Sequence, residues 1–251
     1  WNTETMAGVG PYPDTNVSVR TIKSTSTGDV VVGGRFQRLG SLSCQSICLW
    51  SNPNNQWYNL GNGLKGVVNA VELVGKLQDK VIAVGRFELN QTVPDVAIAK
   101  WILNTPTPVW TPLGSQDRIP GTIRTVAVGE LAHEEADGLV IGGQRAGGDS
   151  FLMNWDNNDW SPIDGLNPIS QIEHVAFVPI RNPSTTINTE HGVKSDRMLL
   201  VSGLIALKDS NVKLASALYD GYNWHPYLIA ADYQGQPGIL GRMVTASEGF
   251  R

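Results

Sequence analysis

The sequence predicts an all-β fold and, within that class, a kelch-like β-propeller. A short β-branched stretch that ends in glycine, VVVGGRF at Val30–Phe36, returns as VIAVGRF at Val81–Phe87. Weaker copies occur at Leu139–Arg145 and Leu199–Ile205. Each copy is followed by two aromatic segments, usually with a tryptophan in each. Repetition at intervals of about fifty to sixty residues is typical of architectures that stack one supersecondary unit.

The composition agrees with strands joined by many turns. The chain of 251 residues contains 27 glycines and 14 prolines, residues that punctuate strands rather than helices. Charged residues make up only 17%, which fits a β-rich extracellular domain better than a cytosolic one. The net charge of −4, without a basic cluster, argues against a nucleic-acid partner.

The first repeat unit, approximately 16–64, has room for four short antiparallel strands, as in a propeller blade. Alternation of apolar and polar residues predicts its first strand, and the β-branched run predicts a second strand that is buried on both faces. The two strands that follow each carry a tryptophan. The expected strands are Val17–Ser24, Asp29–Phe36, Ile47–Ser51 and Gln56–Leu60.

The same plan recurs in three further units. In the second, approximately 65–121, we expect strands at Val67–Val74, Lys80–Phe87, Val96–Ile102 and Val109–Leu113. In the third, approximately 122–168, we expect them at Thr122–Gly129, Gly138–Gln144, Phe151–Asp156 and Trp160–Ile163. In the fourth, approximately 169–238, we expect them at Gln171–Ile180, Arg197–Ile205, Ala215–Asp220 and Asn223–Ile229.

A partial fifth unit is expected over 239–251, with its first strand at Ile239–Ser247. No internal boundary divides residues 1–251, so we expect a single propeller or a segment of one. The longest insertion, Pro179–Ser195, is polar and uneven and predicts a mobile loop between two strands. The chain begins at Trp1, and we expect it to be part of a longer protein.

The residues that recur in every unit are assigned structural roles. A glycine that ends a buried strand permits a bulge or a close backbone approach, and tryptophans supply buried area between blades. Because these residues follow the repeat, core packing is favoured over ligand stacking. They are Gly34, Gly85, Gly143, Gly203, Trp50, Trp57, Trp101, Trp110, Trp155, Trp160 and Trp224, with Tyr219 replacing one tryptophan of the fourth unit.

The two cysteines, Cys44 and Cys48, leave two interpretations open. They could be free buried thiols, or they could form a disulfide in an oxidising compartment if the chain bends around Gln45–Ile47. A zinc site is poorly supported, because no second cysteine pair exists and the four histidines are scattered.

No other motif indicates catalysis, a metal or a cofactor. Asp156–Asp159 lacks the glycine and glutamate of a calcium loop and predicts a hairpin tip. His133–Asp137 begins like HExxH but has no second histidine. His225 and Pro226 are interpreted as packing residues. We therefore expect a protein that is not an enzyme.

Two sequons predict N-glycosylation, Asn16-Val17-Ser18 and Asn90-Gln91-Thr92. Asn90 follows a predicted central strand, where an exposed loop is expected. Occupied sequons would place the chain in a secretory compartment.

Several segments together resemble the fungal cortical markers of cell polarity, the Rax-type bud-site-selection landmark glycoproteins. They are C-x3-C-L-W at Cys44–Trp50, W-x-x-L-G-x-G-L-x-G at Trp57–Gly66 and A-V-G-R-F at Ala83–Phe87. The opening WNTETMAGVGPYPDT and the closing GRMVTASEGF resemble the margins of the C-terminal conserved region of that family.

The resemblance implies a type I membrane glycoprotein of the fungal cell surface, anchored by a transmembrane helix beyond Arg251. It implies that this region lies on the extracellular face at bud or division sites, and that its partners are other landmark or polarity proteins. It implies a structural Cys44–Cys48 disulfide and no catalytic residues.

Two functions follow as expectations. The first is a non-catalytic extracellular interaction module, because no acid, base or nucleophile set stands apart from the repeat. The alternative is a carbohydrate-binding or carbohydrate-active propeller, of the sugar-oxidase or glycosidase type. That alternative needs copper ligands, or two carboxylates facing each other across the channel.

Overall fold

The computed structural model describes residues 17–75, 78–89, 93–103, 105, 107–129, 138–155, 159–179, 197–208, 210, 212–232 and 234–241. In this part of the chain the secondary structure is strand and turn, with one short 3₁₀ helix at Gln116–Arg118. None of the described residues belongs to a helix long and apolar enough to cross a bilayer.

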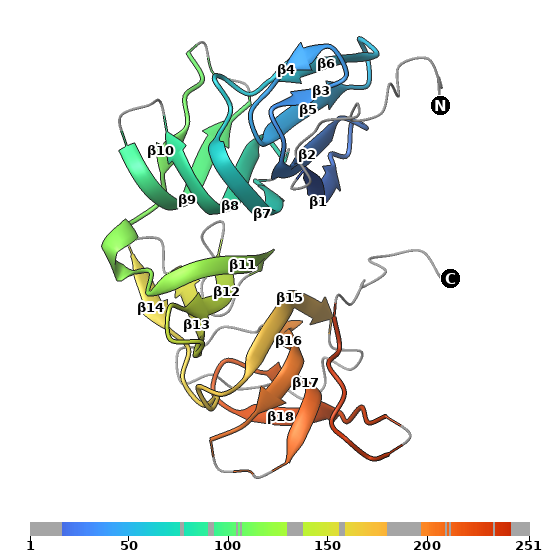
Figure 1. Cartoon of the computed structure of the whole chain (residues 1–251), viewed down its shortest axis with the longest axis vertical. Helices are drawn as coiled ribbons and strands as arrows, with labels where there is room; N and C mark the ends of the chain where they lie inside the picture. The colour runs from blue at the N-terminus through green and yellow to red at the C-terminus, as the bar shows by residue number, and fades with distance from the viewer. Residues whose placement is uncertain are drawn as a thin grey trace. The chain divides into compact units, whose positions relative to one another are not determined.

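The described strands form four antiparallel four-stranded sheets, and in each the strands follow one another along the chain (Figure 1). The first sheet contains β1 (Ser18–Ser24), β2 (Val30–Arg35), β5 (Ile47–Ser51) and β6 (Gln56–Asn59). The second contains β7 (Lys65–Val74), β8 (Lys80–Leu89), β9 (Val93–Ile102) and β10 (Thr111–Pro112). The third contains β11 (Gly121–Val128), β12 (Leu139–Arg145), β13 (Ser150–Trp155) and β14 (Trp160–Pro162). The fourth contains β15 (Gln171–Pro179), β16 (Arg197–Ala206), β17 (Lys213–Tyr219) and β18 (Trp224–Leu228).

The predicted all-β class with four four-stranded units is therefore confirmed. An unpredicted hairpin, β3 (Arg38–Leu39) and β4 (Leu42–Ser43), lies in the loop that holds the cysteines. Of the strand predicted at Ile239–Ser247, the described residues 239–241 are not in a strand, and the rest lies outside the described residues. The Leu240 amide nevertheless donates to the Gly203 carbonyl at 3.1 Å.

The chain divides into two compact halves, Trp1–Asp117 and Arg118–Arg251. In the first half, Val31 and Ile47 of the first sheet pack with Val68 and Val71 of the second. In the second half, the third and fourth sheets share a core in which Val140 and Leu152 pack with residues such as Val175 and Val201. Each half thus contains two consecutive sheets that share a core.

In every sheet the first strand bulges by one residue where it passes the aligned glycine of the second strand. A Cβ atom on that glycine would collide with a carbonyl oxygen of the first strand, so only glycine allows the approach. The glycines and the carbonyls they face are Gly34 and Ser18, Gly85 and Val67, Gly143 and Thr122, and Gly203 and Gln171. The bulged residues are Arg20, Asn69, Arg124 and Glu173.

A buried threonine beside the bulge links the two sheets of each half. The Thr21 hydroxyl accepts a hydrogen bond from the Val71 amide at 3.3 Å, and the Thr125 hydroxyl accepts one from the Val175 amide at 3.1 Å. Both threonines are buried. Val71 and Val175 lie on β7 and β15, which pair on one side only, and the threonine hydroxyl of the preceding sheet supplies an acceptor for their amides.

The repeated aromatic residues pack mainly against each other within a sheet. Trp50 faces Trp57 and Trp155 faces Trp160 across the last two strands, with ring centroids 5.3 and 5.1 Å apart. The pairs Trp101–Trp110 and Tyr219–Trp224 repeat the arrangement at 5.3 and 4.9 Å. In each half the last tryptophan also donates to the link before its own sheet: Trp110 to the Leu60 carbonyl and Trp224 to the Asp164 carbonyl.

Gly85→Val is expected to lower the free energy of unfolding by about 1–3 kcal/mol, because the new side chain would force β8 away from Val67. Chemical denaturation measures the effect. Gly147→Ala is the matched control, since a Cβ there meets nothing within 4 Å. A Gly85→Val variant as stable as the control would refute the close-approach role of the glycine.

Thr125→Val is expected to destabilise by about 1–3 kcal/mol, because the variant leaves the Val175 amide buried without an acceptor. Thr125→Ser keeps the hydroxyl and loses only a methyl group, so its thermal midpoint should lie between those of Thr125→Val and the parent. If the valine variant equals the serine variant, the hydroxyl contributes nothing measurable.

Candidate interaction surface

Ionisable side chains in the described residues serve mainly structural contacts. No group of three or more His, Cys, Asp or Glu residues that could hold a metal ion occurs in the described part of the chain. His133–Asp137 and residues 156–158 lie outside it. Asp159, the last residue of the predicted acidic hairpin tip, is ion-paired with Arg118 at 2.9 Å and accepts from the Trp160 amide at 2.8 Å.

Cys44 and Cys48 form a disulfide, with their Cα atoms 6.0 Å apart. The bend expected between them is present, and Ser46 has a φ of 58°. The disulfide holds the β3–β4 hairpin against the first sheet. Phe36, Leu39 and Leu42 pack there with Val32 and with Trp57. The two sulfur-bearing residues are buried in this cluster, so the disulfide is part of a small apolar core.

Replacing both cysteines, Cys44→Ala with Cys48→Ala, is expected to lower the free energy of unfolding by about 2 kcal/mol through loss of a short covalent loop. Mass spectrometry of unreduced protein supplies the independent check. Two free thiols in secreted material would contradict the disulfide.

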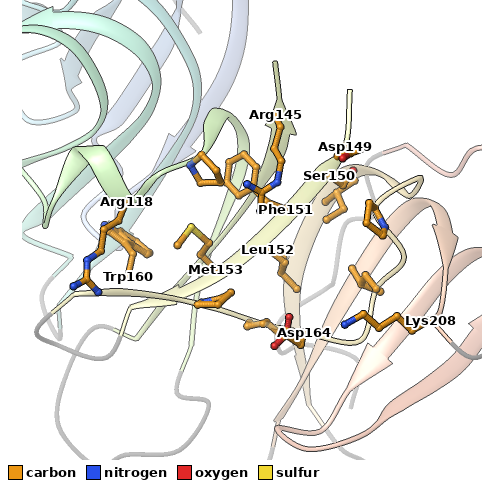
Figure 2. Close-up of a pocket in the computed structure, with 16 residues that line it drawn as sticks. Arg118, Arg145, Asp149, Ser150, Phe151, Leu152, Met153, Trp160, Asp164 and Lys208 are labelled. Carbon is orange, nitrogen blue, oxygen red and sulfur yellow. The ribbon is translucent and has the colours of Figure 1, made fainter. Parts of the chain in front are cut away.

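The third sheet has no counterpart of the β3–β4 hairpin that covers the first sheet. β12 connects to β13 through a tight turn without a hairpin, and a cavity of about 470 Å³ lies there (Figure 2). Phe151, Met153 and Trp160 form apolar walls, and Met153 and Trp160 hold the register positions of Cys48 and Trp57. The rim also carries charge of both signs, from residues such as Arg145, Asp149, Asp164 and Lys208. The cavity has the size and mixed lining of a small-ligand site.

Exposed large apolar side chains gather at the outer edge of the fourth sheet. Tyr222, Tyr227, Leu228 and Ile229 have exposed fractions of 50%, 52%, 41% and 70%, and we call these four residues the tyrosine edge. They lie in one eight-residue stretch that includes β18. Exposed apolar residues are common singly, but four in one short stretch make this edge of the sheet a candidate contact.

The tyrosine edge lies along the outer strand of the fourth sheet, whose free side has both backbone groups and side chains. β18 pairs only with β17, so its other side is unpaired within the described sheet. Pro226 has no amide proton to offer on that strand. The W-x-P pattern of β18 also occurs at Trp110–Pro112 and Trp160–Pro162, whereas β6 has Trp57-Tyr58-Asn59. Pro226 thus reduces the number of backbone donors on β18, while the exposed side chains stay available for contact.

The hairpin between β17 and β18 is held by the side chain of Asp220, which contacts His225. The Asp220 carboxylate lies 2.7 Å from His225 Nε2 and accepts from the amides of Tyr222 and Asn223, both at 2.8 Å. Burial acts to raise the pKa of Asp220, but the hydrogen bonds from His225 and the two amides outweigh it and lower the pKa below its usual value. Burial, followed by the nearby charge of Asp220, raises the pKa of Tyr219.

His225 therefore does not have the purely packing role predicted for it. Its side chain is 49% exposed and pairs with Asp220, because β18 is an outer strand whose far side is open. The contact between Asp220 and His225 and the Asp220 cap of the turn could have been anticipated from the D-G-Y-N-W-H spacing, since a hairpin brings positions on either side of its tip together.

Asp220→Asn is expected to reduce stability at neutral pH. Because the folded-state pKa of Asp220 is lowered, the carboxylate stabilises the fold above the unfolded pKa of about 4. That contribution is lost as the pH falls through the folded-state pKa. Denaturation curves between about pH 2 and about pH 7 should show the variant and the parent converging in acid. A stability difference independent of pH would contradict the assignment.

The other predicted site residues fall into two groups. Asn16 and Asn90, the predicted glycosylation sites, lie outside the described residues, and so does the Pro179–Ser195 insertion except for Pro179 at the end of β15. The repeated glycines and tryptophans lie in the cores and bulges described above. The tyrosine edge was not singled out from the sequence. Tyr227 follows Trp224 at the spacing where Leu60, Leu113 and Ile163 follow their own tryptophans, so it takes an apolar position of the repeat.

Comparison with known proteins identifies relatives that match most of the chain. The model of a family described as the Rax2 C-terminal beta propeller domain matches residues 4–250. Polarized growth protein L1 of a Phoma species is 25% identical over 237 residues, which cover 92% of this chain and 17% of that protein. Polarized growth protein RAX2 of Candida albicans is 25% identical over 211 residues, which cover 80% of this chain and 14% of that protein. The chain thus spans less than a fifth of the length of either relative.

Proposed function

The chain belongs to the Rax2 C-terminal β-propeller family, and we propose that it is a non-catalytic interaction module of a fungal polarised-growth protein. The observation that carries the proposal is the tyrosine edge, a group of exposed aromatic and aliphatic side chains on and beside the outer strand β18. Aromatic residues that are rigid and partly exposed are enriched at protein contacts.

We place the module on the extracellular face of the fungal plasma membrane, at sites of budding or division. The Cys44–Cys48 disulfide supports this placement, because disulfides persist in oxidising compartments. The anchor would be a transmembrane helix elsewhere in the parent protein. Its partners would be other surface proteins of the polarity system, and the tyrosine edge would be the contact.

The double variant Tyr227→Ser with Ile229→Ser, introduced into the complete parent protein, tests the proposal. Imaging of the tagged protein should show that it reaches the surface in normal amount but no longer concentrates at growth sites. Ile169→Ser is the matched control, because Ile169 is 62% exposed but lies outside the tyrosine edge. Normal concentration of the double variant would exclude the tyrosine edge as the contact.

A carbohydrate ligand is the second candidate, and the cavity beside the third sheet is the observation in its favour. Binding of soluble cell-wall glucan fragments to the purified chain distinguishes the two. Saturable binding that is lost in Arg145→Ala and kept in the tyrosine-edge variant would support the carbohydrate function. No binding would leave the protein contact as the function of the module.

A further inference from the structure

The bulges of the two halves build two equivalent contacts between neighbouring sheets. In the first half, Arg20 on the bulge of β1 donates to the side-chain oxygen of Asn69, on the bulge of β7, at 2.5 Å. In the second half, Arg124 on the bulge of β11 pairs with Glu173, on the bulge of β15, at 3.1 Å. Arg20 and Arg124 hold equivalent positions in the two halves. Arg20 faces a side-chain amide, and Arg124 faces a carboxylate.

The residue after the aligned glycine completes each contact. In the second half this residue is Gln144, and its side-chain oxygen accepts from Arg124 at 2.6 Å. In the first half the same position holds Arg35, which pairs in register with Ser18. The bond between Arg124 and Gln144 shows that side chains at these two positions reach each other.

The charges of the two contacts differ as a result. Arg124, Gln144 and Glu173 sum to zero, whereas Arg20, Arg35 and Asn69, which we call the arginine node, carry two positive charges. Arg20 and Arg35 are exposed, and neither forms an ion pair with a carboxylate of the described residues. The corresponding arginine of the second sheet, Arg86, is already paired with Asp95 at 3.0 Å. Among these equivalent positions, the unpaired positive charge therefore belongs to the arginine node.

We propose that the arginine node binds a carboxylate side chain from an acidic segment of a partner protein. Arg20 also donates weakly to the Ser18 hydroxyl, at 3.5 Å, and Ser18 is the register partner of Arg35. Guanidinium groups from these two positions would offer a carboxylate several donors. The choice of a carboxylate rests on Glu173, which fills this position in the second half of the same chain. Because the node is exposed, one contact is weak and sensitive to salt, and a segment with several acidic residues is required. The node is separate from the tyrosine edge, so this proposal does not depend on it.

Fluorescence polarisation of labelled hexaglutamate against the complete chain tests the proposal. We expect saturable binding at low ionic strength that weakens with added sodium chloride, and no binding of labelled hexalysine. Asn69→Glu supplies the carboxylate from within, as Glu173 does, and should weaken hexaglutamate binding about tenfold. Arg35→Gln, which copies Gln144, should have a similar effect. Unchanged melting temperatures establish that both variants remain folded.

The second half offers the converse experiment. Adding Gln144→Arg and Glu173→Asn to the Asn69→Glu chain rebuilds the node around Arg124 and should restore binding. Failure of Asn69→Glu to weaken binding, or failure of the rebuilt node to restore it in a folded variant, would overturn the proposal. Equal competition by inorganic phosphate would overturn the assignment to a carboxylate.

Discussion

The one-residue bulge of the first strand, held against a glycine of the second, is the constraint on which each sheet depends. It repeats at Gly34, Gly85, Gly143 and Gly203, and in each case a carbonyl of the first strand occupies the space of a Cβ atom. The bulge reorients the first strand, and in the first and third sheets the next residue, Thr21 or Thr125, reaches the amide of the following sheet. A local irregularity of the backbone thus becomes the joint between neighbouring sheets.

Much of this fold could be predicted from the sequence, because the repeat carries it. The β-branched runs that end in glycine located the second strand of all four sheets, and the paired aromatic residues located the last two. The hairpin at Arg38–Ser43 was not predictable, since its strands are only two residues long and their apolar side chains have no partner in the sequence pattern. The resemblance carried by C-x3-C-L-W and W-x-x-L-G-x-G-L-x-G is confirmed by the family match over residues 4–250.

The candidate sites were harder to foresee, because they depend on differences between equivalent positions. Gln144 and Arg35 both follow an aligned glycine, and nothing in either sequence segment reveals that Gln144 accepts a hydrogen bond from the arginine of the bulge while Arg35 brings a second positive charge to the equivalent place. The same holds for the cavity, which exists because the β12–β13 turn is short where the β2–β5 loop folds back as a hairpin. Function in a repeat protein of this kind resides where the copies diverge, while stability resides where they agree.

The proline of the W-x-P strands has a consequence for the behaviour of many copies together. Wherever many copies gather, as at the growth sites proposed above, open outer strands of different molecules could pair edge to edge. A proline at Pro112, Pro162 and Pro226 removes a donor from three of these strands and so discourages the pairing. The first sheet has no such proline, and there the disulfide-bound hairpin contacts β6 through β4. A proline in three sheets and a disulfide-bound hairpin in the first would thus both oppose edge-to-edge pairing between crowded molecules.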